Sequence, residues 1–92
     1  MPPILKIGAY WVYFCVKENE PLEPIHVYVA QESPSDKAAK IWITRAGKCY
    51  LCQNHSQIPS HTLRNIIAII EARSEEVIQK WVDSFGEIHY FC

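Results

Sequence analysis

The chain has 92 residues, of which 49% are hydrophobic and 12% aromatic, and this length and composition are typical of one small folded domain. Nine basic and ten acidic side chains give a formal net charge of −1, which argues against general charge-driven binding to nucleic acid or membranes. No apolar run approaches the ~18 residues of a membrane span, and the N-terminus lacks the pattern of a secretory signal. We therefore expect a cytoplasmic protein with no membrane segment and reduced cysteines.

Short β-type segments fill the first half of the chain. Aromatic and β-branched residues, with alternation in the third and fourth segments, predict strands at residues 4–7, 10–16, 25–30, 38–44 and 49–52. Gly8 and Ala46-Gly47-Lys48 are typical of turns, and residues 17–24 and 33–36 are typical of loops. Because most of these links are short, they favour an antiparallel sheet of four to five strands.

The second half has helical periodicity. One-sided apolar stripes run along residues 60–73 and 74–85, with Ser60 and Ser74 at the positions of N-caps and Gly86 at a natural stop. The pattern leaves open one long helix or two short ones. The aromatic tail, residues 88–92, is expected to pair with the sheet or to pack on it. The predicted fold is therefore α+β, with the helices packed on one face of the sheet and residues 1–92 forming a single domain.

Cysteine and histidine spacings suggest a zinc site, with the candidate ligands Cys49, Cys52, His55, His89 and Cys92. However, Cys49 and Cys52 fall on opposite faces of a strand, and no glycine follows Cys49 to form a tight knuckle. The alternative is that the cysteines are small apolar residues that fill the core. We expect no metal and no other cofactor.

The polar side of the sheet is the main candidate site. If strands 25–30 and 38–44 are neighbours, one face carries an aromatic and cationic group of side chains, namely His26, Tyr28, Lys40, Trp42 and Thr44. Such a surface can stack a base and hold a phosphate. The alternative is that the helices cover this face and that His26 and Tyr28 are core residues.

Two further considerations bear on this face. The opposite face carries Ile25, Val27 and Val29, which suit the isoleucine-rich helix better, so we expect the His26 face to be the more open one. A small ribonuclease could also be built here by acid–base and charge stabilisation, with the candidate catalytic residues His26, Tyr28, Lys40 and Arg45.

Basic side chains gather in one stretch of the chain. Residues 37–48 contain four basic and no acidic side chains, whereas residues 17–36 contain one basic and five acidic ones. One interpretation is solvated strand ends and loops. The other is a small basic patch on an acidic body, suited to one acidic partner or to a short phosphate backbone.

The strand at residues 10–16 has neither proline nor charge to protect it from pairing with other strands. Cover can come from Tyr90 and Phe91 of the tail, from a homodimer or from a strand of a partner. We expect that the chain is not a simple monomer.

Five segments in order resemble the small bacterial proteins of domain of unknown function family 4160. These segments are Met1–Gly8, Glu23–Val29, Lys40–Ile43, Asn54–Pro59 and the stretch from Lys80-Trp81 to Cys92. The resemblance implies no established activity. It implies a toxin–antitoxin-like gene pair, in which the partner is a small protein encoded by a neighbouring gene. Relatives often have a second histidine where this chain has Tyr28, so a two-histidine site is not expected.

Together, these observations give a leading hypothesis and an alternative. The leading hypothesis is a component of a toxin–antitoxin-like pair that acts by binding a partner protein and is not an enzyme; whether it is the toxic or the neutralising member is open. The alternative is a small RNA-cleaving toxin, although the net charge does not indicate RNA binding.

Overall fold

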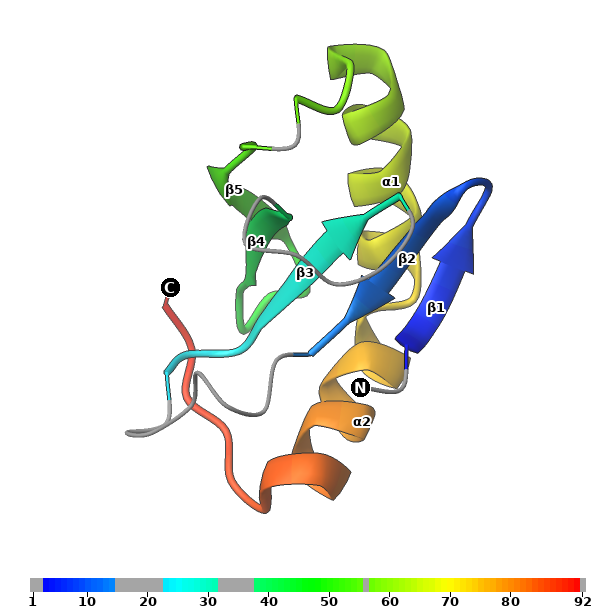
Figure 1. Cartoon of the computed structure of the whole chain (residues 1–92). Coiled ribbons are helices and arrows are strands. Elements are labelled where there is room, and N and C mark those ends of the chain that lie inside the picture. Colours follow the sequence, from blue (N-terminus) through cyan, green and yellow to red (C-terminus); the bar gives the residue numbers. More distant parts are fainter. Residues whose placement is uncertain (1–2, 15–22, 32–37, 56, 92) are drawn as a thin grey trace.

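A computed structural model describes residues 3–14, 23–31, 38–55 and 57–91 (Figure 1). The loops expected at residues 17–24 and 33–36 lie wholly or largely outside the described residues. So do residues 15–16 of the second strand, and Cys92.

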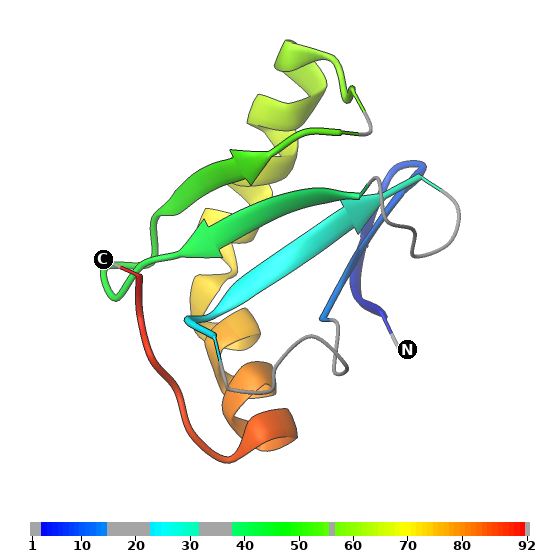
Figure 2. The same cartoon turned by 60° about the vertical axis from the view of Figure 1, so that its left-hand side comes forward.

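Five strands form one antiparallel sheet in which each strand pairs with its neighbours in sequence, in the order β1-β2-β3-β4-β5. The strands are β1 (Pro3–Ile7), β2 (Tyr10–Tyr13), β3 (His26–Ala30), β4 (Ala39–Ile43) and β5 (Cys49–Gln53). Two helices follow, and Figure 2 shows both on the same side of the sheet. The predicted α+β fold, with its antiparallel sheet and C-terminal helices, is confirmed.

Tight turns join the first and the last strand pairs. Gly8 has a φ of 58° and Gly47 a φ of 80°, values that L-residues with a side chain rarely adopt. In the second turn the Thr44 N–H donates to the Lys48 carbonyl at 2.8 Å. A Cβ atom on Gly47 would lie 2.7 Å from Ser74 Oγ, so this hairpin also packs closely on the start of the second helix.

The helices are α1 (Ser60–Ala72) and α2 (Ser74–Phe85), so the chain breaks at Arg73. Neither Ser60 nor Ser74 is an N-cap, and that prediction is wrong: the caps are Pro59 and Arg73, without side-chain hydrogen bonds. The Arg73 N–H still donates to carbonyls of α1, so Ser74 already belongs to the first turn of α2. Gly86 ends α2 in the left-handed conformation, as expected.

The core lies between the helices and one face of the sheet. That face supplies Val12, Ile25, Val27, Val29, Ile41 and Ile43, and the helices supply Leu63, Ile66, Ile70, Val77 and Trp81. The Trp81 ring is fully buried and meets Phe14 edge-on at a centroid distance of 5.1 Å. The expectation that the aliphatic face of β3 and β4 receives the helices is therefore confirmed.

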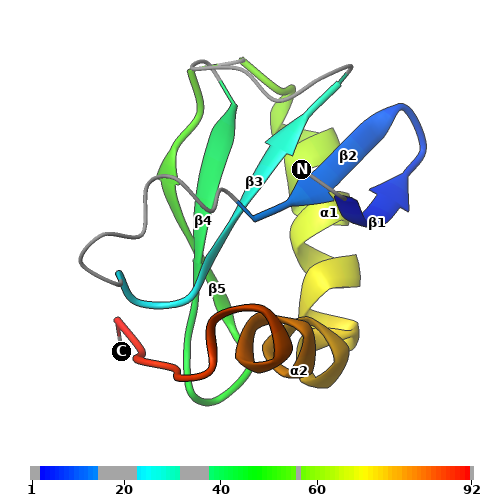
Figure 3. The same cartoon turned by 60° about the horizontal axis from the view of Figure 1, so that its bottom comes forward.

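The C-terminal tail leaves α2 and runs past the start of β3 (Figure 3). The Ile25 N–H donates to the His89 carbonyl at 2.8 Å, and the Trp81 indole N–H donates to the Glu87 carbonyl at 3.1 Å. The Phe91 ring stacks on Trp42 of β4, with centroids 5.2 Å apart and an interplanar angle of 8°. The described part of the tail therefore packs on the sheet, as expected.

The expectation that the strand at residues 10–16 is open to pairing with further strands is wrong. The second strand is not an edge strand, because β2 lies between β1 and β3, and the edges are β1 and β5. The described tail residues stack on Trp42 of β4 and do not lie along β2. Sequence alternation predicts which faces are apolar, but it does not set the order of the strands.

Candidate functional site

The strands bring the expected polar face together. In the β3–β4 pairing, His26 lies opposite Trp42 and Tyr28 lies opposite Lys40. On the other side of β3, Tyr28 lies opposite Tyr13, and the two rings stack with centroids 5.8 Å apart. The candidate residues of β3 and β4 are therefore neighbours in space.

This face is more open than the aliphatic one, because Lys40 and Trp42 are half-buried, but three of its residues are buried, as the alternative interpretation holds for His26 and Tyr28. His26 is 0% exposed, Thr44 4% and Tyr28 9%. Because β3 is the central strand, neighbouring strands flank both of its edges, and the tail runs along its start.

His26 is enclosed by aromatic rings. Its ring lies 5.3 Å from that of Tyr28 and 5.4 Å from that of Trp81, and its Nδ1 lies 2.8 Å from the Pro24 carbonyl oxygen. With that oxygen as acceptor, Nδ1 carries the proton. These contacts are typical of a structural histidine. Its ring packs against Tyr28 of β3 and against Trp81 of α2.

Lys40 is held inside the same face. Its Nζ lies 3.2 Å from Glu23 Oε1 and 4.6 Å from the Trp42 ring centroid, and its side chain is 13% exposed. The ion pair neutralises the charge of the ammonium group within the protein. Lys40 is therefore less available to an external phosphate than its position in the sequence indicates.

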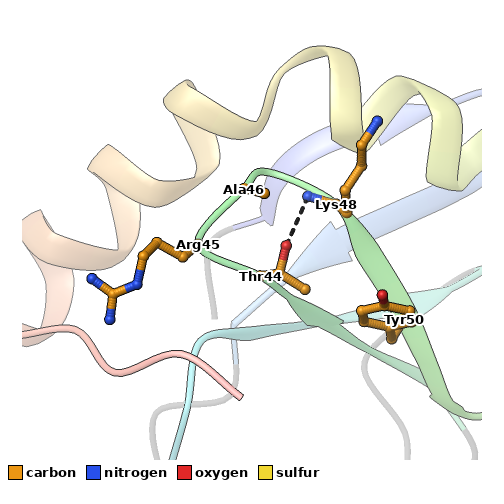
Figure 4. A pocket seen from close by; sticks show the side chains of 5 residues that line it. All are labelled: Thr44, Arg45, Ala46, Lys48 and Tyr50. Atoms are coloured by element: carbon orange, nitrogen blue, oxygen red, sulfur yellow. Dashed lines mark hydrogen bonds between the residues drawn. The ribbon is translucent and has the colours of Figure 1, made fainter. Parts of the chain in front are cut away.

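The open part of the region is the tip of the β4–β5 hairpin. A hollow of about 470 Å³ is lined there by Thr44, Arg45, Ala46, Lys48 and Tyr50 (Figure 4). The buried Thr44 hydroxyl accepts the Lys48 N–H at 3.1 Å and so holds the turn. Figure 4 shows the Arg45 and Lys48 side chains extending to opposite sides of the hairpin.

Aromatic rings lie near this hairpin tip. The Arg45 guanidinium lies 4.9 Å from the Tyr90 ring centroid, and Tyr50 lies opposite Trp42 in the β4–β5 pairing. Tyr50 and Phe91 are 54% and 57% exposed. We call this group the hairpin surface; it consists of Trp42, Arg45, Lys48, Tyr50, Tyr90 and Phe91.

Trp42 and Arg45 of the hairpin surface were predicted site residues, and Lys48 belongs to the predicted basic patch at residues 37–48. Tyr50, Tyr90 and Phe91 were not predicted as site residues. One signal was available for Tyr50, since it follows the turn at the position that faces Trp42. For Tyr90 and Phe91 the aromatic tail predicted packing, but nothing in the sequence indicated which strand receives it.

A second exposed feature is the edge strand β5. It contains neither proline nor a charged residue, and Tyr50 and Leu51 are large, exposed apolar side chains. The Cys49 N–H donates to the Glu71 carboxylate of α1 at 2.8 Å, so it points away from β4. Because such N–H groups alternate along an antiparallel strand, that of Leu51 also points outward.

The cysteines of β5 have different environments. Burial, and secondarily the Glu71 carboxylate, raise the pKa of Cys49 to about 12, whereas Cys52 is exposed. Among the described residues, no group of three His, Cys, Asp or Glu side chains is placed to hold a metal ion. Of the candidate zinc ligands, His89 has its Nε2 atom 3.8 Å from Oε1 of Glu87. Cys92 lies outside the described residues.

The fold defines a small α+β protein with a five-stranded antiparallel meander backed by two helices. Residues 9–82 match the family model described as Domain of unknown function (DUF4160), and the chain belongs to this family. Neither the curated proteins nor the solved structures contain a match to the chain. No helix within the described ranges is both long and apolar enough to cross a membrane.

Proposed function

We propose that this protein binds a partner protein that adds a strand to β5, and that it does so as one component of a toxin–antitoxin-like pair. The observation that carries the proposal is the edge strand β5, which contains neither proline nor a charged residue. The partner is expected to be the small protein of a neighbouring gene, in line with the resemblance of the chain to family 4160.

The two edges of the sheet differ in a way that favours β5. The edge strand β1 begins with Pro3, carries the exposed Lys6 and has an irregular register near its start. In addition, Lys80 of α2 donates to the Ile4 carbonyl at 3.0 Å. Proline, charge and register irregularity are the features by which proteins prevent strand addition.

By contrast, β5 has neither proline nor charge, although its pairing with β4 also shifts register near its end, and the Glu71 carboxylate accepts the Cys49 N–H. Beyond it, the outward peptide groups of Leu51 are open to a partner strand, beside two exposed apolar side chains. Backbone hydrogen bonds would supply affinity, and contacts to Leu51 would supply specificity.

The alternative function, RNA cleavage, stays a prediction; its candidate residues are His26, Tyr28, Lys40 and Arg45. The burial of His26 weighs against a role in direct proton transfer, since a general acid or base must reach the substrate. Arg45 is exposed and offers the cleaner test. Growth arrest that disappears in Arg45→Ala would support cleavage, and arrest that survives would remove Arg45 from the site.

The proposed interface is tested by co-expression with the neighbouring gene product, followed by size exclusion. Leu51→Lys places a charge on β5 and should abolish co-elution. Ile69→Lys is the matched control, because Ile69 is an exposed apolar residue on α1 and should tolerate the charge. Circular dichroism verifies that both variants fold.

Hydrogen exchange provides a second measurement that needs no variant. The Leu51 amide should be exchange-labile in the free protein and protected in the complex, since a partner strand would accept its hydrogen bond. Failure of the wild-type proteins to co-elute, or a complex in which this amide stays unprotected, would contradict the proposal.

A further inference from the structure

We propose that the hairpin surface binds single-stranded nucleic acid, with phosphates held by Arg45 and Lys48 and a base stacked on Tyr50. This site is separate from the outward backbone of β5 and does not depend on the protein partner. It also differs from the predicted catalytic face, because His26 and Lys40 take no part in it.

The first argument is charge. Lys40, Arg73 and Lys80 each form an ion pair within the protein. Among the described residues, Arg45 and Lys48 form none, although both are exposed and both line the same hollow. The Glu71 carboxylate accepts the Cys49 N–H and keeps its negative charge, so it offsets only part of the two positive charges. The hairpin tip is therefore a local cationic site on a weakly acidic protein, and it attracts anions.

The second argument is the exposure of aromatic rings beside these cations. Tyr50 and Phe91 are each more than half exposed, and Phe91 is already stacked face to face on Trp42. Isolated aromatic residues on a surface are unremarkable, but here Tyr50 lies opposite Trp42, on which Phe91 stacks, in the hairpin that carries both cations. Nucleobases stack on such rings whatever their sequence, because every base has a π-face.

The geometry favours a strand over a single phosphate or a mononucleotide. Arg45 and Lys48 diverge to opposite sides of the hairpin, so they do not converge on one anion (Figure 4). Arg45 is also oriented by its contact with the Tyr90 ring, which keeps its guanidinium on the side of the tail. Two separated cations can bind successive phosphates of one nucleic-acid strand. A nearby aromatic ring can stack on an unpaired base of that strand.

A duplex fits the surface poorly, because its bases are already stacked on each other and present no free face to Tyr50. The net charge of −1 also limits the length of strand that the protein can hold. We therefore expect a short, salt-sensitive site that prefers single strands.

The test is fluorescence anisotropy with the full chain and a labelled oligouridylate of about ten nucleotides. Near 0.1 M salt, Arg45→Ala/Lys48→Ala should weaken binding about tenfold or more and reduce the slope of log K against log salt by about 1.4, two contacts at about 0.7 each. Arg64→Ala removes an exposed charge on α1 and should change binding by less than about twofold.

The stacking part of the site has its own variants. Tyr50→Ala should weaken binding about fivefold or more, whereas Tyr50→Phe keeps the ring and should stay within about twofold of wild type. An RNA duplex of the same length should bind at least about fivefold more weakly than the single strand. Circular dichroism of each variant checks that the fold is retained.

Several outcomes would overturn the proposal. They are no binding of the oligouridylate by the wild type, equal loss in Arg64→Ala and Arg45→Ala/Lys48→Ala, and equal affinity for duplex and single strand. A further contradicting outcome is that Arg45→Ala/Lys48→Ala abolishes co-elution with the partner protein and leaves RNA binding unchanged. The hairpin surface would then be a binding site for the partner protein and not for nucleic acid. Because Leu51→Lys tests the β5 edge separately, the two proposals can fail independently.

Discussion

Cys49 and Cys52 lie three residues apart on β5, yet their thiols should react very differently. Burial and the Glu71 carboxylate raise the pKa of Cys49 to about 12, so near pH 8 its thiol is almost entirely protonated. Cys52 is exposed. We expect iodoacetamide to modify Cys52 in the folded protein and to leave Cys49 intact.

Trypsin cleavage after Lys48 and Arg64 leaves both cysteines in one peptide, in which fragment masses assign the modified residue. The unfolded protein is the control, since both thiols should react there. Equal modification of Cys49 and Cys52 in the folded protein would show that Cys49 is not shielded.

His26 should contribute to stability. Its ring fills a fully buried position between Tyr28, Trp42 and Trp81, so His26→Ala leaves a cavity. We expect a loss of about 2–4 kcal/mol in the free energy of unfolding, measured with urea, and a smaller loss in His26→Phe, which keeps a ring. A His26→Ala variant as stable as the wild type would contradict the packing described here.

For single residues, the sequence predicts which side chains lie next to each other better than it predicts which of them are buried. Alternation along two strands placed His26 and Tyr28 beside Lys40 and Trp42, because side-chain direction in a strand is a local property. The burial of His26 depends on Trp81 and on the tail, which come from distant parts of the sequence. No local pattern contains that information.

At the scale of elements, the hairpin turn and the start of α2 should be coupled. Gly47 and Gly86 both have a positive φ, but only Gly47 faces another residue, Ser74. We expect Gly86→Ala to cost about 1 kcal/mol, for backbone strain alone, and Gly47→Ala about 2 kcal/mol or more. Urea denaturation of the two variants gives the comparison.

A double-mutant cycle separates the steric contribution from the strain. In the Ser74→Gly background the extra cost of Gly47→Ala should shrink, because the Oγ and Cβ atoms that the new methyl group would meet are gone. Additive costs in the cycle would mean that the turn and the helix do not interact.

The elements themselves were predicted well and their ends poorly. Strand alternation and helical stripes span many residues, so errors at single positions do not alter them. The N-caps at Ser60 and Ser74 failed because each cap depends on the backbone conformation of one residue. The strand order, and with it the exposed edge at β5, depends on pairing across the whole sheet.

At the scale of the whole molecule, the tail acts through its backbone as much as through its side chains. The Glu87 and His89 carbonyls accept the hydrogen bonds of Trp81 and Ile25. Deletion of residues 87–92 leaves both buried donors without these acceptors and should cost about 2–4 kcal/mol. Urea denaturation measures the loss.

His89→Ala is the matched control for the deletion. The His89 side chain is 60% exposed, and its carbonyl is retained in the variant, so the stability should change by less than about 0.5 kcal/mol. A loss in His89→Ala comparable to that of the deletion would show that the imidazole, and not the backbone, holds the tail. That the chain is not a simple monomer stays a prediction, and light scattering would test it.

The tail also gives the protein an order of assembly. Every strand pairs with its neighbour in sequence, so the strands of the meander can pair one after another during synthesis of the chain. The bond between Ile25 and His89, in contrast, joins an early strand to a segment synthesised after both helices. Until that segment docks, Trp42 lacks its stacked ring and the indole N–H of Trp81 lacks its acceptor, so nascent and partly opened molecules share the same uncovered aromatic end.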